Sequence, residues 1–237
     1  MFRIGILGAA DIAFNKFIPA LMKVEGAECA GVASNSPDKL KRFVEKYNVH
    51  VYSSYNEVIG DDSVDCVYIP LPPAFHYEWA KKALLAGKHV FLEKPSTTSA
   101  DDTKELVGIA GEKGLVVQEN YMFQFHAQLK EIENLIASDE LGKLRLVRTS
   151  FGFPRRAEGD FRYVKELGGG TMMDNGGYTI KLIDMLLGES MRLVSSQLDY
   201  DEKTGIDIFG TAEFVNDDGV IAQAAFGMDC QYQCSLE

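Results

Sequence analysis

Short apolar runs alternate with helical stretches over the first half of the chain, and this alternation restricts the fold more than any other feature. Strand-like runs occupy residues 3–7, 27–33, 49–52, 64–69, 90–93 and 115–118. Helical patterns occupy residues 14–23, 38–47, 74–85 and 99–113. Strands that alternate with helices form a parallel sheet covered on both faces. The sequence therefore predicts an α/β fold that opens with a doubly wound parallel sheet.

The pattern changes near residue 121 and predicts a second domain. A helix is expected over 123–137, a long strand over 143–153, and a helix over 171–187 after Gly168-Gly169-Gly170. Strands follow at 192–200, 206–215 and 220–228, the last two joined as a hairpin by Asp217-Asp218-Gly219. We expect domains 1–121 and 122–237, the second of α+β type, with helices on one face of a largely antiparallel open sheet.

Charge and composition exclude several classes of function. The net charge of −11 argues against a nucleic-acid partner. No apolar run reaches the ~18–20 residues that span a bilayer, and the chain starts directly with a strand, so we expect no secretory signal and a cytoplasmic protein. Cys29 and Cys66 lie in strand-like runs and are expected to be buried thiols, whereas Cys230 and Cys234 lack further ligands for a metal.

The first strand runs into a turn and a helix, the arrangement that binds dinucleotides. Gly8 is the turn glycine, and alanines stand at the other two fingerprint positions, Ala10 and Ala13. Backbone amides at a helix start hold a pyrophosphate. The expected contacts are Gly8, Ala9, Ala10, Asp11 and Ile12. A simple strand–helix turn is the alternative, and Pro19 predicts a kink or a restart of the helix.

The end of the second strand favours NADP mildly over NAD. NAD-binding sheets carry a carboxylate there for the ribose 2′-hydroxyl, and positions 33–36 hold none. Ser34, Asn35 and Lys39, with Arg42 nearby, would accept a 2′-phosphate. The alternative is that these residues only form the turn and cap the next helix.

Lys94 stands at the carboxyl end of a buried strand, where ligands of open α/β sheets bind. Asp174 and Tyr178 are four residues apart on a predicted helix that also contains Gly176 and Gly177. Two helical glycines cost about 2 kcal/mol, so something must approach that backbone closely. A phenol beside an ammonium has a lowered pKa and can exchange a proton with an alkoxide. The alternatives are a salt-bridged strand end and a kinked helix with a core tyrosine.

The opening strand–turn–helix, Glu93-Lys94-Pro95 and the run from Gly168 to Tyr178 resemble the glucose–fructose oxidoreductase/inositol dehydrogenase (Gfo/Idh/MocA) family. The resemblance covers essentially the whole chain. It implies a Rossmann domain, a C-terminal α/β domain, and hydride transfer between NAD(P) and a sugar, polyol or dihydrodiol-like alcohol. It also implies Lys94 and Tyr178 as the catalytic pair. Because Asp174 shares a helix face with Tyr178, we expect it to hold a substrate hydroxyl. With a tyrosine at position 178, the chain resembles the dihydrodiol and xylose dehydrogenases and the nucleotide-sugar ketoreductases of the family.

The same resemblance implies further cofactor contacts. Leu71, Pro72 and His76 match a loop against the nicotinamide half, and Asn120 matches a residue near the nicotinamide. Glu93 and Lys94 belong to the same site, and Arg162 matches an arginine that contacts cofactor phosphate. His76 and Arg162 also have structural interpretations, as a capping histidine and a solvated loop charge. His126 is expected to pack or to lie at the surface rather than to react.

Family members run well past 300 residues, whereas this chain has 237. One interpretation of the shorter length is that the chain is a fragment of a longer protein. The other is that the second sheet has an exposed edge that pairs with another copy. We expect a homo-oligomer, a dimer or tetramer, through the C-terminal sheet. The alternative function is a non-catalytic protein that senses NAD(P) or sugar, and a further alternative is an inactive fragment.

Overall fold

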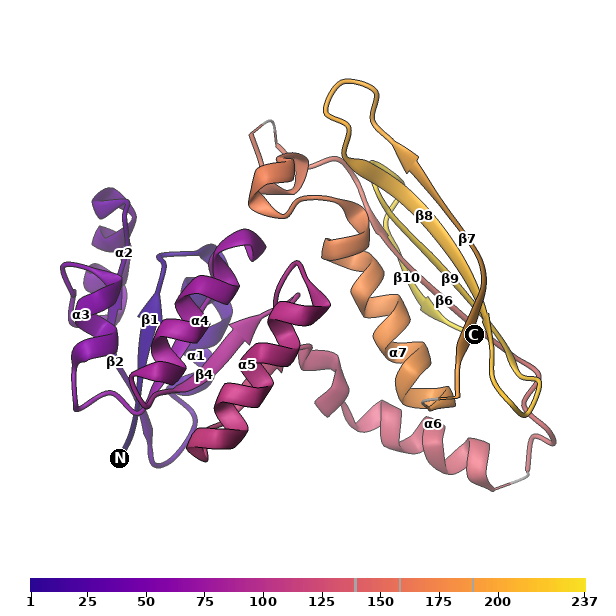
Figure 1. Cartoon of the computed structure of the whole chain (residues 1–237), viewed down its shortest axis with the longest axis horizontal. Helices are drawn as coiled ribbons and strands as arrows, with labels where there is room; N and C mark the ends of the chain where they lie inside the picture. The colour runs from indigo at the N-terminus through magenta and orange to yellow at the C-terminus, as the bar shows by residue number, and fades with distance from the viewer. Residues whose placement is uncertain (139, 158, 189) are drawn as a thin grey trace. The chain divides into compact units, whose positions relative to one another are not determined.

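The computed structural model describes residues 1–138, 140–157, 159–188 and 190–237. The chain forms two compact units, Met1–Asn120 and Tyr121–Glu237 (Figure 1). The predicted boundary lay one residue later, after residue 121.

The first unit is built on a five-stranded parallel sheet in the order β2-β1-β3-β4-β5. The predicted doubly wound fold is confirmed. The strands are β1 (Phe2–Leu7), β2 (Ala27–Ala33), β3 (Cys66–Ile69), β4 (His89–Glu93) and β5 (Val117–Asn120). The helices are α1 (Ile18–Leu21), α2 (Pro37–Tyr47), α3 (Tyr55–Gly60), α4 (His76–Leu85) and α5 (Ala100–Lys113).

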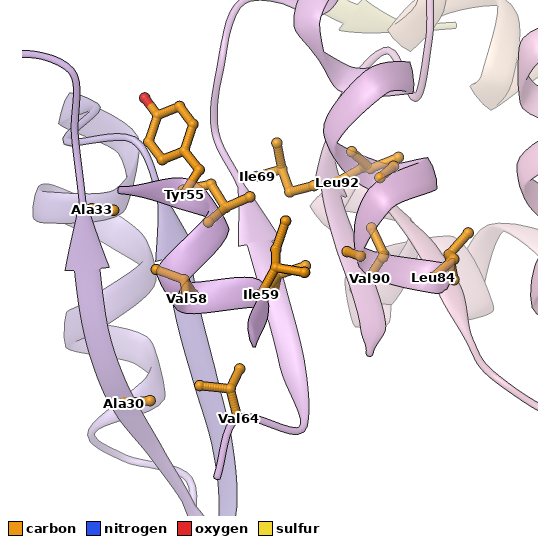
Figure 2. Close-up of a cluster of buried hydrophobic side chains, with 14 of the residues drawn as sticks. Ala30, Ala33, Tyr55, Val58, Ile59, Val64, Ile69, Leu84, Val90 and Leu92 are labelled. Atoms are coloured by element: carbon orange, nitrogen blue, oxygen red, sulfur yellow. The ribbon is translucent and has the colours of Figure 1, made fainter. Parts of the chain in front are cut away.

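Apolar side chains fill both faces of this sheet. On one face, Val58 and Ile59 of α3, Leu84 of α4 and Leu106 of α5 pack on the strands; Figure 2 shows part of this cluster. On the other face, Ile18 of α1 and the α2 side chains pack around Tyr68. Burial of this apolar surface on both sides is the main force that stabilises such a sheet.

The helix that follows β1 is not a regular α-helix. It begins at Asp11, passes through a π-helical turn at Ala13–Phe17, and continues as α1. Pro19 stands in the first turn of α1, where its missing N–H costs little. The predicted restart at this proline is confirmed.

Two sequence predictions in the first unit need correction. The strand expected at 49–52 is a single bridge between Val51 and Val32, because α2 ends at left-handed Asn48 and α3 starts soon afterwards. The strand expected at 115–118 is shifted to Val117–Asn120, because left-handed Gly114 ends α5 and two residues are needed to return to the sheet.

The second unit is a five-stranded sheet in the order β10-β6-β9-β8-β7. Its strands are β6 (Leu146–Phe153), β7 (Arg192–Tyr200), β8 (Asp207–Val215), β9 (Ile221–Met228) and β10 (Gln233–Leu236). The hairpin of β8 and β9 is confirmed. The sheet is mixed, since β6 and β9 run parallel while the other neighbours are antiparallel. The sequence prediction missed β10.

Helix α7 (Gly177–Leu187) packs on this sheet against β6 and β9 (Figure 1). Ile183 of α7 meets Val147, Ala222 and Phe226 in a buried cluster. The helix is preceded by a π-helical turn, Met172–Gly176. The helix expected over 123–137 is instead a 3-10 turn, Met122–Phe125, followed by α6 (Ala127–Ala137). The His126 side chain accepts a hydrogen bond from Gln128 N and so starts α6 as a separate helix.

Candidate active site

A cleft opens at the carboxyl edge of the first sheet, next to the turn after β1. It has a volume of about 430 Å³. Gly8, Ala9 and Ala10 line it from one side, and Leu71 and Pro72 from the loop after β3. The carboxyl edge of a parallel sheet is the usual ligand site of such folds. Five residues predicted to contact a cofactor are therefore brought together here.

The turn itself is shaped by Gly8. Its φ is +122°, a conformation that side chains other than glycine rarely adopt, and a Cβ would come within 2.9 Å of Leu71 Cδ2. The helical segment that starts at Asp11 directs its first amides toward this turn. A close-fitting backbone turn that leads into a helix start fits the pyrophosphate of a dinucleotide.

The far end of the cleft is lined by the residues that follow β2. Ser34 is half-buried, whereas Asn35 and Lys39 are exposed, and all three line the cleft. Arg42 lies beside a smaller hollow of about 250 Å³ together with Lys39 and Asp11. Arg42 binds the Asp11 carboxylate at 2.6 Å and stacks over the Phe14 ring at 4.6 Å.

Aromatic residues that were not predicted from the sequence as site residues also line the cleft. They are Tyr55 from α3, Phe75 from the 3-10 turn Pro73–Phe75, and Trp79 from α4. The rings of Tyr55 and Trp79 meet edge to face at 5.0 Å. Each lies within the first turn or so of a helix that leads away from the carboxyl edge. The sequence could have indicated these aromatic residues, because each follows the carboxyl end of a predicted strand.

His76 is fully buried and is not among the residues that line the cleft. Its Nδ1 faces the Pro95 carbonyl oxygen at 2.8 Å, and its Nε2 faces the Leu71 carbonyl oxygen at 2.7 Å. Burial lowers the pKa of His76. The ring thus joins the loop after β3 to the turn after β4. It therefore stabilises the loop whose Leu71 and Pro72 line the cleft.

Glu93 and Asn120 bind each other at the ends of β4 and β5. Oε1 of Glu93 accepts a hydrogen bond of 2.6 Å from Asn120 Nδ2 and one of 2.5 Å from the Tyr68 hydroxyl. Burial and the Glu93 carboxylate raise the pKa of Tyr68 far above its usual value. These hydrogen bonds hold the end of β4 in place, and Lys94 is the next residue of the chain. Lys94 is half-buried in the turn after β4.

In the second unit, Tyr178 lies in the first turn of α7 among three aromatic rings. Its ring centre is 5.0 Å from that of Tyr121, 5.2 Å from Phe151 and 5.8 Å from Phe123. It also lines a mainly apolar cavity of about 530 Å³ between α6, α7, β6 and β10. His126 lines the same cavity; it is exposed and caps α6.

Asp174 and Arg162 form an ion pair in the same unit. Arg162 Nε donates to Asp174 Oδ2 at 2.8 Å, and Nη1 donates to Asp160 Oδ1 at 3.1 Å. Burial works against the guanidinium charge, but the two carboxylates outweigh it and raise the pKa of Arg162. Two residues predicted to contact different ligands are therefore bound to each other.

The close approach expected at the helical glycines comes from the protein's own rings. A Cβ on Gly176 would meet Phe226 and Met172 at 3.2 Å, and one on Gly177 would meet the Tyr121 hydroxyl. Lys94 belongs to the first unit, and Tyr178 and Asp174 belong to the second. Within each unit, the predicted residues lie at the carboxyl edge of the first sheet or around the start of α7.

Sequence comparison decides the family. Residues 2–121 match the sequence model of the oxidoreductase family with an NAD-binding Rossmann fold, and residues 129–237 match that of the GFO/IDH/MocA C-terminal domain. The chain belongs to the Gfo/Idh/MocA family. As a member of that family, it is an NAD(P)-dependent oxidoreductase.

Curated Gfo/Idh/MocA enzymes align over nearly the whole chain. The dTDP-3,4-didehydro-2,6-dideoxy-alpha-D-glucose 3-reductase of Actinomadura kijaniata is 36% identical, over 99% of this chain and 71% of its own length. The D-xylose 1-dehydrogenase (NADP(+)) 2 of Haloferax volcanii is 33% identical, over 95% of this chain and 69% of its own length.

A solved Gfo/Idh/MocA structure has the same fold. It is KijD10, a 3-ketoreductase from Actinomadura kijaniata in complex with NADP and TDP-benzene. The TM-score is 0.96 at 35% identity, over 99% of this chain and 72% of that one. The similarity confirms the predicted α/β class for both units. Among the described residues, we find no helix with the length and apolar character needed to cross a membrane.

Proposed function

We propose that this enzyme interconverts an alcohol and a carbonyl group on a sugar, polyol or dihydrodiol-like substrate, with NADP as its preferred cofactor. The observation that carries the proposal is the cleft at the carboxyl edge of the first sheet, shaped by Gly8 and lined by Ser34, Asn35 and Lys39. Its lining offers neutral donors and a cation where an NAD-specific sheet would offer a carboxylate.

The residues of the cleft would hold NADP as follows. The turn from Gly8 and the amides of the following helix start would bind the pyrophosphate. Ser34, Asn35 and Lys39 would bind the 2′-phosphate, with Arg42 beside them. Leu71, Pro72, Glu93, Lys94 and Asn120 would border the nicotinamide half. When bound, the nicotinamide supplies or accepts the two electrons of the reaction.

We propose that Tyr178 exchanges the proton with the substrate oxygen and that Lys94 assists it. A tyrosine with its usual pKa of ~10 exchanges protons poorly near neutral pH. An adjacent ammonium favours the phenolate and lowers that pKa. Asp174 would orient a substrate hydroxyl from its place beside Arg162. A contact between Arg162 and a cofactor phosphate would use Nη2, since Nε and Nη1 bind carboxylates.

The substrate class follows from the relatives. Those named above act on a dTDP-linked keto-sugar and on D-xylose, and a relative from Xenopus tropicalis, 28% identical over 86% of this chain, is a trans-1,2-dihydrobenzene-1,2-diol dehydrogenase. These compounds share a ring bearing adjacent oxygen functions. A dTDP-linked keto-sugar is our first candidate, because the 36% relative covers 99% of the chain.

The test is an assay of the purified chain with dTDP-keto-sugars, aldoses and trans-dihydrodiols, each with NADP(H) and NAD(H). We expect turnover that depends on NADP(H) in at least one substrate group. Tyr178→Phe should lose most of that turnover while NADPH affinity stays nearly unchanged. Full activity of this variant would contradict the proton-transfer role. Tight NADPH binding without turnover on any substrate would favour the cofactor- or sugar-sensing alternative.

We further propose a cytoplasmic homo-oligomer, a dimer or tetramer, that associates through the open face of the second sheet. α7 covers one face, and alternation along the strands directs Phe209, Thr211 and Glu213 to the other. A polar row crosses that face, from Arg148 to Gln223 at 3.0 Å and from Gln223 to Glu213 at 2.9 Å. Light scattering on the purified chain tests this association, and a monomer at all concentrations would contradict it.

A further inference from the structure

Gly177 has no conformational reason to be glycine. It is the first residue of α7 and directly precedes Tyr178. Its φ and ψ of −56° and −35° are ordinary helical angles that alanine adopts freely. Glycine inside a helix is less favourable than alanine by about 1 kcal/mol. The reason for this glycine must therefore be found in what lies beside it.

The hydroxyl of Tyr121 occupies the space that a side chain at position 177 would need. A Cβ built on Gly177 would overlap Tyr121 Oη and lie 3.2 Å from Tyr121 Cζ. A real Cβ does not tolerate such an overlap, and Tyr121 cannot withdraw easily because it is only 5% exposed. Gly177 is thus a gap that admits the Tyr121 hydroxyl to the backbone of α7.

The same Tyr121 ring contacts the side chain of the next residue. Its plane is almost perpendicular to that of Tyr178, at 88° with 5.0 Å between the ring centres. Edge-to-face packing of this kind is the favourable geometry for two aromatic rings. Tyr121 therefore contacts both the backbone before Tyr178 and the Tyr178 ring.

Phe123 and Phe151 flank the Tyr178 ring as well, from the 3-10 turn and from β6. A tyrosine has two side-chain torsions, and contacts on three sides limit both. A proton donor acts efficiently only when its oxygen is held close to the productive position. Among these three rings, Tyr121 is the one that also contacts the helix backbone through Gly177.

We propose that Tyr121 is a positioning residue that fixes the Tyr178 phenol, and that Gly177 is required because it admits the Tyr121 hydroxyl. Tyr121 acts through Tyr178 and takes no part in the proton exchange itself. This inference rests on the proposed role of Tyr178 in proton exchange, but the contact between Tyr121 and Gly177 can be tested without it.

The contact is tested by a double-mutant cycle with Gly177→Ala and Tyr121→Phe. In the wild-type background, Gly177→Ala should lower kcat at least tenfold and lower the urea midpoint of unfolding. In the Tyr121→Phe background the same substitution should cost clearly less in kcat and in the urea midpoint, because the overlapping hydroxyl is gone and the nearest remaining ring atom lies 3.2 Å away. Equal costs in both backgrounds would overturn the inference.

Gly176→Ala is the matched control. Its Cβ would meet Phe226 and Met172 at 3.2 Å, so Tyr121→Phe should not relieve its cost. Relief of both alanine variants by Tyr121→Phe would show a general loosening of the unit and would contradict the specific contact.

The positioning role is tested with Tyr121→Leu, which removes the ring. We expect kcat to fall at least tenfold while the dissociation constant for NADPH stays within twofold. A parallel loss of NADPH binding, or unchanged kcat, would overturn the role. Tyr178→Phe belongs in the same series: if it retains full turnover, the proposed function fails, whereas the urea midpoints of the cycle still decide whether the contact exists.

Discussion

Arg162 Nε donates a hydrogen bond of 2.8 Å to Oδ2 of Asp174, although the sequence assigned these residues to a cofactor phosphate and a substrate hydroxyl respectively. The side chains are only 24% and 11% exposed, so the pair is weakly screened by solvent. The π-helical turn at Met172–Gly176 places Asp174 toward Arg162, next to the start of α7. Substitution of either residue therefore disturbs the other.

Asp174→Asn should lower the free energy of unfolding by about 1–3 kcal/mol, because a charge-assisted hydrogen bond to Arg162 is lost while the one to Asp160 remains. It should also lower kcat/KM about tenfold if the carboxylate orients a substrate hydroxyl. Asp160→Asn is the matched control, since it removes the other carboxylate of the same guanidinium. Equal effects of both variants on kcat/KM would argue against a substrate role for Asp174.

Asn35→Asp should shift the cofactor preference toward NAD. A carboxylate at the end of β2 accepts hydrogen bonds from a ribose 2′-hydroxyl and repels a 2′-phosphate. We expect NADPH affinity to fall at least tenfold and NADH affinity to hold or improve. Lys39→Ala should weaken NADPH alone, whereas Lys41→Ala, whose ammonium binds Asp38 on α2, should change neither. Fluorescence titration of both cofactors measures the ratio, and an unchanged ratio would place the 2′-phosphate elsewhere.

Lys94→Met should raise the apparent pKa of the group that controls kcat. In the proposed mechanism the Lys94 ammonium favours the Tyr178 phenolate, and this substitution removes that effect. The pH profile of kcat shows the shift, and Lys94→Arg should retain most of the wild-type profile because the charge remains. Loss of activity with an unmoved profile would mean that Lys94 acts on binding and not on the proton.

His76→Ala should weaken NADPH binding although His76 does not line the cleft. The substitution removes both contacts that join the loop carrying Leu71 to the turn carrying Pro95. We expect a loss of about 1–3 kcal/mol in the free energy of unfolding and a several-fold higher dissociation constant. His89→Gln is the comparison, because His89 makes its hydrogen bond to Val116 at the opposite end of β4. Equal NADPH affinity in wild type and His76→Ala would remove His76 from the site.

Thiol reagents should distinguish Cys234 from Cys29 and Cys66. Burial raises the pKa of Cys66 to about 12 and that of Cys29 to about 11, so neither forms the reactive thiolate at a pH of about 8. Cys234 is exposed. We expect fast modification at Cys234 and slow modification at Cys29 and Cys66, measured by mass spectrometry of the labelled peptides. Fast labelling of Cys66 in the native chain would show that β3 opens readily.

The elements that were predictable are those encoded by local patterns. Alternating apolar runs predicted the parallel sheet, and Ser99 marked the start of α5, where its side chain accepts a hydrogen bond from Asp102 N. The cleft was predictable because the turn after β1 and the end of β2 follow directly from strand positions. Four-residue strand β10 was missed, because its neighbour β6 is some eighty positions earlier in the chain.

Side-chain contacts between distant positions were not predictable in the same way. The contact of Tyr121 with Gly177 joins residues 56 positions apart, and neither periodicity nor turn chemistry encodes it. The sequence did show two glycines in a predicted helix, which lower helix stability for no evident reason. One of them, Gly177, is the residue beside the Tyr121 hydroxyl. The ion pair of Arg162 and Asp174 was hidden for a different reason, because each residue had a plausible ligand of its own.

The π-helical turn at Met172–Gly176 has a consequence for the evolution of this chain. A π turn contains one residue more than the α-helical turn it replaces. Deleting one residue from it would restore a regular helix and remove the wide turn that carries Asp174. Asp174 would then turn away from Arg162 while Tyr178 kept its place. Insertions and deletions at this point are therefore expected to be selected against more strongly than substitutions, and the length of the segment between Gly170 and Tyr178 should vary less among relatives than its composition.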